Sequence, residues 1–158
     1  MTRRYAAETS VSTDASISEI RALVRRYGAT EFGHMESEMR AQIVFTMNAR
    51  RIMFRLEMPD RAGQEFWQTN HAKPQKRTLE AATLAWEQSC RSLYRALALI
   101  VKAKLEAVAI GIVEFESEFL GNIVMPGTGI TVGEAIKPQL ALSYKTGSIP
   151  PLLEGPRP

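Results

Sequence analysis

The longest regular pattern in this chain covers residues 79–110, LEAATLAWEQSCRSLYRALALIVKAKLEAVAI. Its apolar side chains recur every three or four residues from Leu79 to Val108, which places them along one side of an α-helix. Thr78 is a suitable N-cap before this pattern, and Gly111 is a suitable stop after it. The sequence therefore predicts one long central helix over residues 79–110, about 48 Å long at 1.5 Å per residue.

The residues before this helix predict an antiparallel sheet. Residues 39–47 and 51–58 alternate apolar and polar side chains, as strands with one buried face do. A shorter strand is expected at residues 30–37, and residues 5–13 are a candidate for a fourth strand. Between residues 5–13 and residues 30–37, apolar residues recur at helical spacing. They predict an N-terminal helix that ends at Gly28.

The residues after the long helix predict short helices and a tail. Residues 114–120 have helical spacing, and Thr131 with Glu134 has the spacing of a capping box that starts a last helix. Residues 147–158, GSIPPLLEGPRP, are rich in proline and glycine. We therefore expect an α+β fold of one domain over residues 1–146, with a three- to four-stranded antiparallel sheet packed on the N-terminal helix and the long central helix. A C-terminal tail over residues 147–158 follows.

Composition excludes several classes of protein. The chain has 158 residues, of which 45% are hydrophobic and 23% charged, as in an ordinary globular domain. It has no apolar run of about 18 residues and no apolar signal segment, so we expect neither a membrane partner nor secretion. Cys90 is the only cysteine, and no spacing matches a metal site, a nucleotide loop or a hydrolase motif. We therefore expect no cofactor, no metal and no catalytic residue.

Charge is distributed unevenly along the chain. Residues 1–60 have a net charge of +1, residues 61–105 have +5, and residues 106–158 have −3. Phe66 and Trp67 lie among the basic residues of the middle segment. Cationic side chains bind phosphates and aromatic side chains stack on bases, so this combination is typical of single-stranded nucleic-acid binding. The order of one helix, three antiparallel strands and one helix also resembles, in topology, the double-stranded RNA-binding fold. A core of three strands and one helix with a basic groove resembles, in topology, the phage single-strand annealing proteins.

These observations predict a nucleic-acid site in a groove between the arginine-bearing strands and the long helix. Arg40, Arg51 and Arg55 are expected to share the polar face of the sheet. The residues expected to contact phosphates are Arg50, Arg51, Arg55, Arg61, Lys73, Lys76 and Arg77, and Trp67 or Phe66 is expected to stack on a base. Two alternatives remain open. The two aromatic residues can instead anchor the loop to the core beside solvated arginines, or the basic segment can be a subunit interface.

Several segments resemble a family of small uncharacterised proteins that phages and prophages carry. These segments are TSVS (9–12), RYGA (26–29), PDR (59–61), AWEQSCRSLYRALALIVKAKLEAVAIGI (85–112), FESEFL (115–120) and TVGEAIKPQL (131–140). The resemblance covers nearly the whole chain and implies an origin in a mobile element, with action in the cytoplasm of the infected bacterium. It supplies no catalytic residues.

The resemblance and the charge pattern together lead to two functional expectations. The first is a phage-encoded, non-catalytic nucleic-acid-binding accessory protein of DNA replication, recombination or annealing, with single-stranded DNA as the favoured partner. The alternative is a protein-interaction module that inhibits or modulates a bacterial host or defence protein. The alternative is motivated by a helix that is apolar nearly all round at residues 93–101 and by the opposite charges of the two halves. A homo-oligomer is compatible with both.

Overall fold

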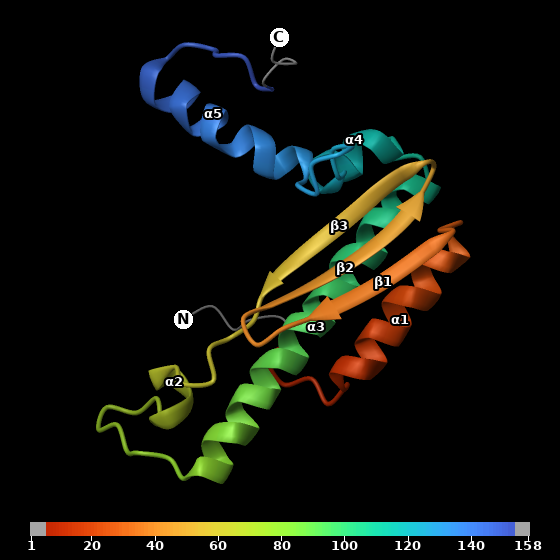
Figure 1. Cartoon of the computed structure of the whole chain (residues 1–158). Coiled ribbons are helices and arrows are strands. Elements are labelled where there is room, and N and C mark those ends of the chain that lie inside the picture. The colour runs from red at the N-terminus through yellow and green to blue at the C-terminus, as the bar shows by residue number, and fades with distance from the viewer. Residues whose placement is uncertain (1–5, 154–158) are drawn as a thin grey trace.

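The computed structural model describes residues 6–153 and confirms the α+β class. Its elements in chain order are α1 (Thr13–Arg26), β1 (Glu31–Glu36), β2 (Arg40–Met47), β3 (Arg50–Glu57), α2 (Gln64–Trp67), α3 (Leu79–Ala109), α4 (Phe115–Phe119), the 3-10 turn η1 (Leu120–Asn122) and α5 (Val132–Thr146), as Figure 1 shows. The three strands form one antiparallel sheet in the order β1-β2-β3. Within the described residues, no helix is long and apolar enough to cross a membrane.

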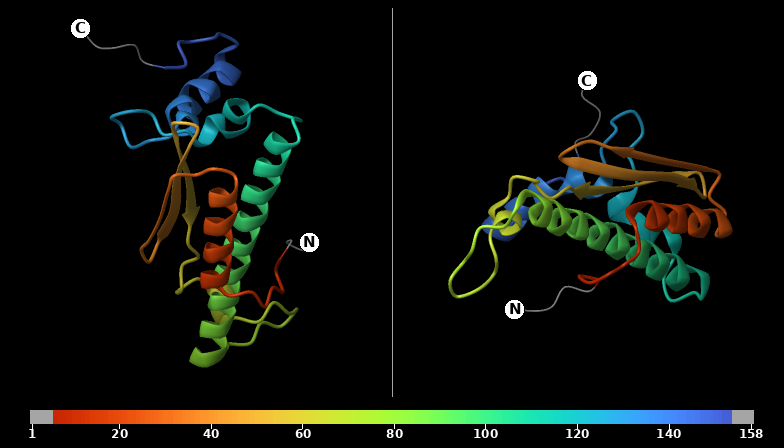
Figure 2. Two further views of the ribbon diagram at one scale, coloured as in Figure 1. Left: turned by 90° about the vertical axis from the view of Figure 1, so that its right-hand side faces the viewer. Right: turned by 90° about the horizontal axis from the view of Figure 1, so that it is seen from below.

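The sheet and the helices α1 and α3 form two layers (Figure 2). Alternation along β2 and β3 directs Ile43, Phe45, Ile52 and Phe54 toward the helices, where they form a buried cluster with Leu97 and other residues of α3. The opposite face of the sheet is not covered by either helix and faces the viewer in Figure 1. The predicted alternation therefore separates a buried face from an open one.

Helix α3 confirms the long helix that the apolar spacing predicts. It spans 31 residues, and the hydroxyl of Thr78 caps it by accepting a hydrogen bond from the backbone N–H of Ala81 at 3.2 Å. Tyr94, Val101 and Leu105 on its inner side are at most 2% exposed. These buried residues are the reason that a helix of this length is stable, because most helical stability in proteins comes from packing of the apolar side.

The hairpin between β2 and β3 turns through two residues with positive φ. Asn48 has φ of 51° and Ala49 has φ of 57°. This two-residue turn matches the right-handed twist of the strands, although the left-handed conformation costs alanine about 1–2 kcal/mol. The turn fixes the register that pairs Thr46 with Arg51 and Gln42 with Arg55.

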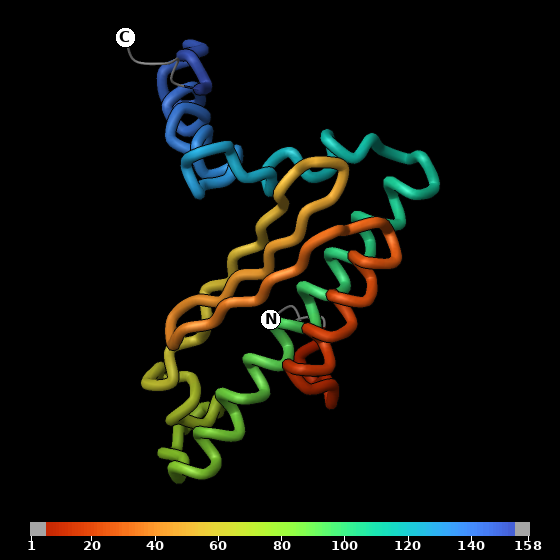
Figure 3. Tube along the Cα trace, turned by 45° about the vertical axis from the view of Figure 1, so that its right-hand side comes forward, coloured from red at the N-terminus to blue at the C-terminus, as the bar shows by residue number. Residues whose placement is uncertain are grey.

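The C-terminal segment extends the sheet by one short contact and then leaves it. The N–H of Val124 donates to the carbonyl of Arg51 at 2.8 Å, beside a bridge between Ile52 and Ile123. Helix α5 begins at Val132, and its N-cap Thr131 forms the predicted capping box with Glu134. None of its residues is buried, and it projects away from the body of the molecule (Figures 1 and 3).

The candidate fourth strand at residues 5–13 is not formed among residues 6–13, and residue 5 lies outside the described residues. The side chain of Gln88 on α3 donates from Nε2 to the carbonyls of Ala7 at 3.1 Å and Thr9 at 2.9 Å. The hydroxyl of Ser92 donates to the carbonyl of Ala6. Polar side chains of α3 thus take the backbone acceptors that a fourth strand would have used.

Candidate nucleic-acid interface

The open face of the sheet brings together side chains from β2 and β3. The register places Arg40 opposite Glu57, Gln42 opposite Arg55, and Thr46 opposite Arg51 on this face. We call this surface the open sheet face; its members are Arg40, Gln42, Val44, Thr46, Arg51, Met53, Arg55 and Glu57, with Glu31, Gly33 and Met35 beside them on β1. Val44 and Met53 are buried at its centre, and the three arginines are exposed around them.

The arginines of this face differ in their partners. Arg51 is exposed and has no ion pair within the part of the chain that the structure describes. Arg40 lies 3.8 Å from Glu57, with most of both side chains exposed. An exposed pair at this distance contributes about 0–1 kcal/mol, so it does not prevent Arg40 from binding another anion.

Arg55 and Arg50 contact the C-terminal third of the molecule. Arg55 forms an ion pair with Glu134 and donates from Nη2 to the carbonyl of Gly129 at 3.0 Å. The backbone N–H of Thr131 and the charge of Arg55 hold the pKa of the Glu134 carboxyl below its usual value, although partial burial opposes them. Arg50 at the hairpin pairs with Glu116 at 2.7 Å, with 46% of its side chain exposed. These two arginines therefore have structural roles as well as exposed surface.

The aromatic residues of the basic loop anchor it to α3 and to itself. Phe66 is 6% exposed. The indole N–H of Trp67 donates to the carbonyl of Arg61 at 3.1 Å. The guanidinium of Arg61 lies 5.4 Å from the ring centre of Trp86 and donates to the hydroxyl of Thr83. This arrangement favours the anchoring alternative for Phe66 and restricts Trp67 as a platform for a base.

The remaining basic residues of the loop face outward. Lys73 and Lys76 are exposed, whereas Arg77 is half-buried and donates from Nη1 to the carbonyl of Phe66 at 3.4 Å. This loop lies beyond the Pro59 end of β3, beside the N-terminal end of α3, and extends toward the helix side of the molecule (Figures 1 and 2). The hairpin arginines Arg50 and Arg51 are at the other end of β3.

The expected groove between the arginine-bearing strands and α3 is therefore not formed. Period-2 alternation directs Arg51 and Arg55 away from α3, and Ile52 and Phe54 fill the space toward Leu97. The predicted site residues divide into one group on or beside the open sheet face and another group in the loop. The first group is Arg50, Arg51 and Arg55; the second is Arg61, Trp67, Lys73, Lys76 and Arg77.

The C-terminal third adds residues that sequence reasoning did not place in the site. A cleft of about 340 Å³ lies between β3 and the start of α5, with Asn122 and Lys137 among its lining residues and Met53 and Arg55 on its sheet side. The amide of Asn122 donates to the carbonyl of Met53 at 3.1 Å. No motif in the sequence signals this contact, because it depends on where a distant segment meets the edge of β3.

A partly buried polar cluster lies on the helix side of the sheet, where the buried Tyr94 meets the exposed carboxylate of Glu36. The Tyr94 hydroxyl donates its proton to Glu36 Oε2 at 2.6 Å. It lies 2.9 Å from His34 Nε2, and because its own proton is already donated, this ring nitrogen is the donor of the second bond. Burial and Glu36 raise the pKa of Tyr94, and burial raises the pKa of Cys90 to about 11. Cys90 is therefore a protonated thiol at neutral pH, the form that is not nucleophilic.

Within residues 6–153, no three His, Cys, Asp or Glu side chains are grouped so as to hold a metal ion.

Comparison with known proteins found no match among family models, curated proteins or solved structures. The function is therefore inferred from geometry and charge.

Proposed function

We propose that this protein is a phage-encoded, non-catalytic accessory protein that binds single-stranded nucleic acid, with DNA as the favoured form, on the open sheet face. Its place would be in DNA replication, recombination or annealing. The observation that carries the proposal is a sheet face that the helices leave uncovered and around which Arg40, Arg51 and Arg55 are exposed. Phosphate contacts of this kind supply most of the affinity of sequence-independent binding.

The shape of this face favours a single strand over a duplex. Three strands about 4.8 Å apart make a surface about 10 Å across. Proteins read the major groove of a DNA duplex by inserting a helix or a two-stranded ribbon, and this sheet surface is neither. Gln42 and Thr46 lie between the arginines and offer hydrogen-bonding groups, and Met35 offers an exposed apolar contact. The aromatic residues of β2 and β3, Phe45 and Phe54, are on the buried face. Binding on this face should therefore depend on phosphates and show little sequence preference.

A titration of labelled oligonucleotides tests the proposal. Fluorescence anisotropy should show binding to single-stranded DNA at about 50 mM salt, with a loss of affinity of 10-fold or more at about 200 mM salt as counterion release requires. Titrations of double-stranded DNA and single-stranded RNA of the same length, compared with single-stranded DNA, show which form of nucleic acid the protein prefers. A chain that leaves all of these oligonucleotides unbound at about 50 mM salt contradicts the proposal.

The alternative function, a module that binds a bacterial host protein, is favoured by a different observation. Helix α5 and the residues after it expose Tyr144 and Ile149, which are 86% and 90% exposed. Such a module would form a complex that tolerates salt and would show no affinity for oligonucleotides, so the same titration separates the two functions.

A further inference from the structure

The C-terminal arm, which we define as α5 with residues 147–153, exposes an unusual amount of apolar surface. None of the residues of α5 is buried, and the arm meets the rest of the molecule mainly at η1. The exposed large apolar side chains of the arm are Leu140, Leu142, Tyr144, Ile149, Leu152 and Leu153. Single exposed apolar residues are ordinary, but six on one projecting arm indicate a surface that another molecule covers.

A recess at the other end of β3 has matching chemistry. Two neighbouring clefts, of about 530 and 620 Å³, share Pro59 in their linings, and we call them together the Pro59 recess. The first cleft has walls formed by Met39, Met58 and Trp86, and the second by Ala85, Leu93 and Ala96. Small side chains beside larger apolar ones leave room for the side chains of an incoming helix.

The charges of the arm and the recess are opposite. The recess is lined by Glu36, Glu38, Glu57 and Asp60, of which Glu36 accepts from Tyr94 and Glu57 forms an exposed pair with Arg40. Arg61, the cation in these linings, already lies against the ring of Trp86. The arm carries Lys137 and Lys145, and its acidic residue Glu134 is paired with Arg55 of its own chain. Opposite charge on two apolar surfaces favours their association and sets its orientation.

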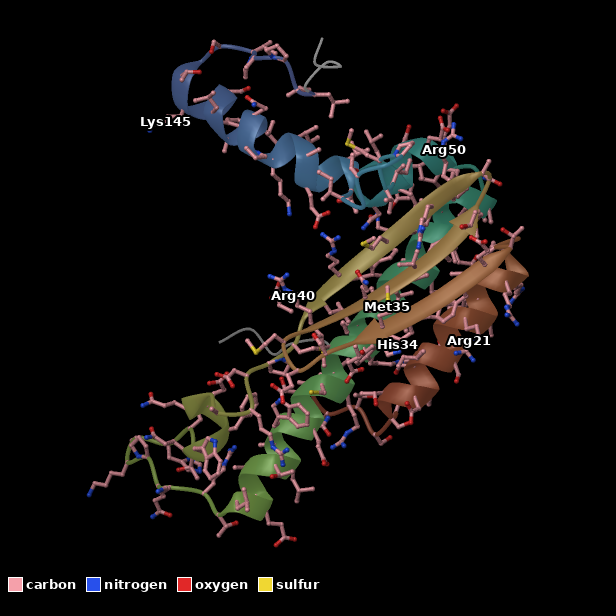
Figure 4. All side chains as sticks on the ribbon, viewed as in Figure 1. Arg21, His34, Met35, Arg40, Arg50 and Lys145 are labelled. Carbon is pink, nitrogen blue, oxygen red and sulfur yellow. The ribbon has the colours of Figure 1, made fainter. Side chains whose placement is uncertain are left out.

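The arm does not occupy the recess of its own chain. It begins beside Met53 and Arg55 of β3, where Arg55 pairs with Glu134, and the recess lies at the Glu57 end of the same strand. Figure 4 shows Lys145 at the far end of the arm, away from Arg40 at the recess end of the sheet. Figures 1 and 3 show the arm pointing away from the body in both views.

We propose that the arm of one molecule binds in the Pro59 recess of a second copy of the same chain. The two surfaces are different, so the contact is heterologous: each copy offers one arm and one recess, and repetition gives a ring or a filament. The proposal does not depend on the nucleic-acid function. Glu57 of the open sheet face lines the recess and Arg55 of that face pairs with Glu134 at the start of the arm, whereas Arg51 lies outside both contact surfaces.

A mixing experiment with two defective variants tests this inference. The arm variant is Leu140→Glu with Tyr144→Glu, and the recess variant is Ala85→Lys with Ala96→Lys. These sites are exposed or half-buried, and unchanged circular dichroism shows that each variant folds. Sedimentation velocity from about 1 to about 100 μM should show wild-type species that grow with concentration, while each variant alone stays monomeric.

The mixture gives the decisive result. The recess variant has an intact arm and the arm variant an intact recess, so an equimolar mixture should form a 1:1 heterodimer and nothing larger. A wild-type chain that stays monomeric at about 100 μM, or a mixture that stays monomeric, overturns the proposal and leaves a foreign protein as the occupant of the arm.

A charge exchange provides a second measurement. Lys137→Glu with Lys145→Glu should weaken assembly of the protein by 10-fold or more, since two favourable interactions become repulsive. Adding Glu38→Lys and Glu57→Lys to the same chain should restore much of it. A failure of the exchange to restore assembly contradicts the assignment of the recess as the partner surface.

Discussion

Tyr94 connects the sheet to α3 through a polar contact at the edge of the core. Its side chain is fully buried, and its hydroxyl donates to Glu36 and accepts from His34, both on β1. A buried hydroxyl of this kind is stabilising only while each of its hydrogen bonds is made. The residue therefore holds β1, the outer strand of the sheet, against the long helix.

Replacement of this hydroxyl should be costly. Tyr94→Phe leaves Glu36 and His34 without their common partner and should lower the free energy of unfolding by about 1–3 kcal/mol, measured by urea denaturation. Tyr27→Phe is the matched control, because the half-buried Tyr27 bonds one residue, Glu106, whereas the fully buried Tyr94 contacts two, so the Tyr27 change should cost less. Equal losses in the two variants would contradict a special role for the Tyr94 cluster.

The same region makes stability fall at alkaline pH. The thiol of Cys90 has its pKa raised from 9.0 to about 11 by burial, and the pKa of Tyr94 is raised as well. A group with a raised pKa keeps its proton in the folded state while the unfolded chain loses it, so stability is lost as the pH rises from about 9 upward. Cys90→Ala should therefore show a smaller fall in unfolding free energy between about pH 8 and pH 10.5 than wild type, by an amount on the order of 1–2 kcal/mol. Identical pH profiles would show that the thiol does not contribute.

At the scale of elements, the attachment of the arm depends on a close approach between two glycines. A Cβ added to Gly133 would lie 2.7 Å from the carbonyl oxygen of Gly121, a backbone atom that cannot move aside alone. Around this contact, the segment is held by the Val124 N–H bond to Arg51 and by the pair of Arg55 with Glu134. The start of α5 is thus fixed on η1 and β3 although the rest of the helix is free of the body.

Gly133→Ala should loosen this attachment. We expect faster cleavage of residues 125–130 in limited proteolysis and a loss of stability of about 1–3 kcal/mol from the forced displacement. Gly121→Ala is the control, because a Cβ at Gly121 meets nothing within 4 Å. A Gly133→Ala variant that resists the protease as well as wild type would contradict the close approach.

At the scale of the whole molecule, local signals predicted the elements but not how the distant ones meet. The apolar spacing of residues 79–110 and the alternation of β2 and β3 are properties of neighbouring residues, and they predicted α3 and the two faces of the sheet to within a few residues. The contact of Val124 with Arg51 is between backbone groups, which leave no mark in the sequence. Alternation assigned Arg40, Arg51 and Arg55 to one face, and the expected groove beside them was wrong because α3 packs on the opposite, apolar face.

The separation of the basic residues follows from the same cause. The net charge of residues 61–105 includes Lys73 and Lys76 of the loop together with Arg91 and Arg95 of α3. In three dimensions the loop lies past the Pro59 end of the sheet, away from Arg50 and Arg51. Charge along a sequence therefore indicates the sign of a partner, and only the fold shows which residues can contact it together.

The central claim is that the open sheet face binds nucleic acid, and the salt dependence of binding by two matched variants tests it most directly. Arg40→Gln with Arg51→Gln removes two charges from that face, and Lys73→Gln with Lys76→Gln removes two from the loop. The account predicts that the sheet-face variant lowers the slope of log K against log salt for single-stranded DNA by about 0.7 per lost phosphate contact, while the loop variant keeps the wild-type slope. A lowered slope in the loop variant with a wild-type slope in the sheet-face variant would contradict the account.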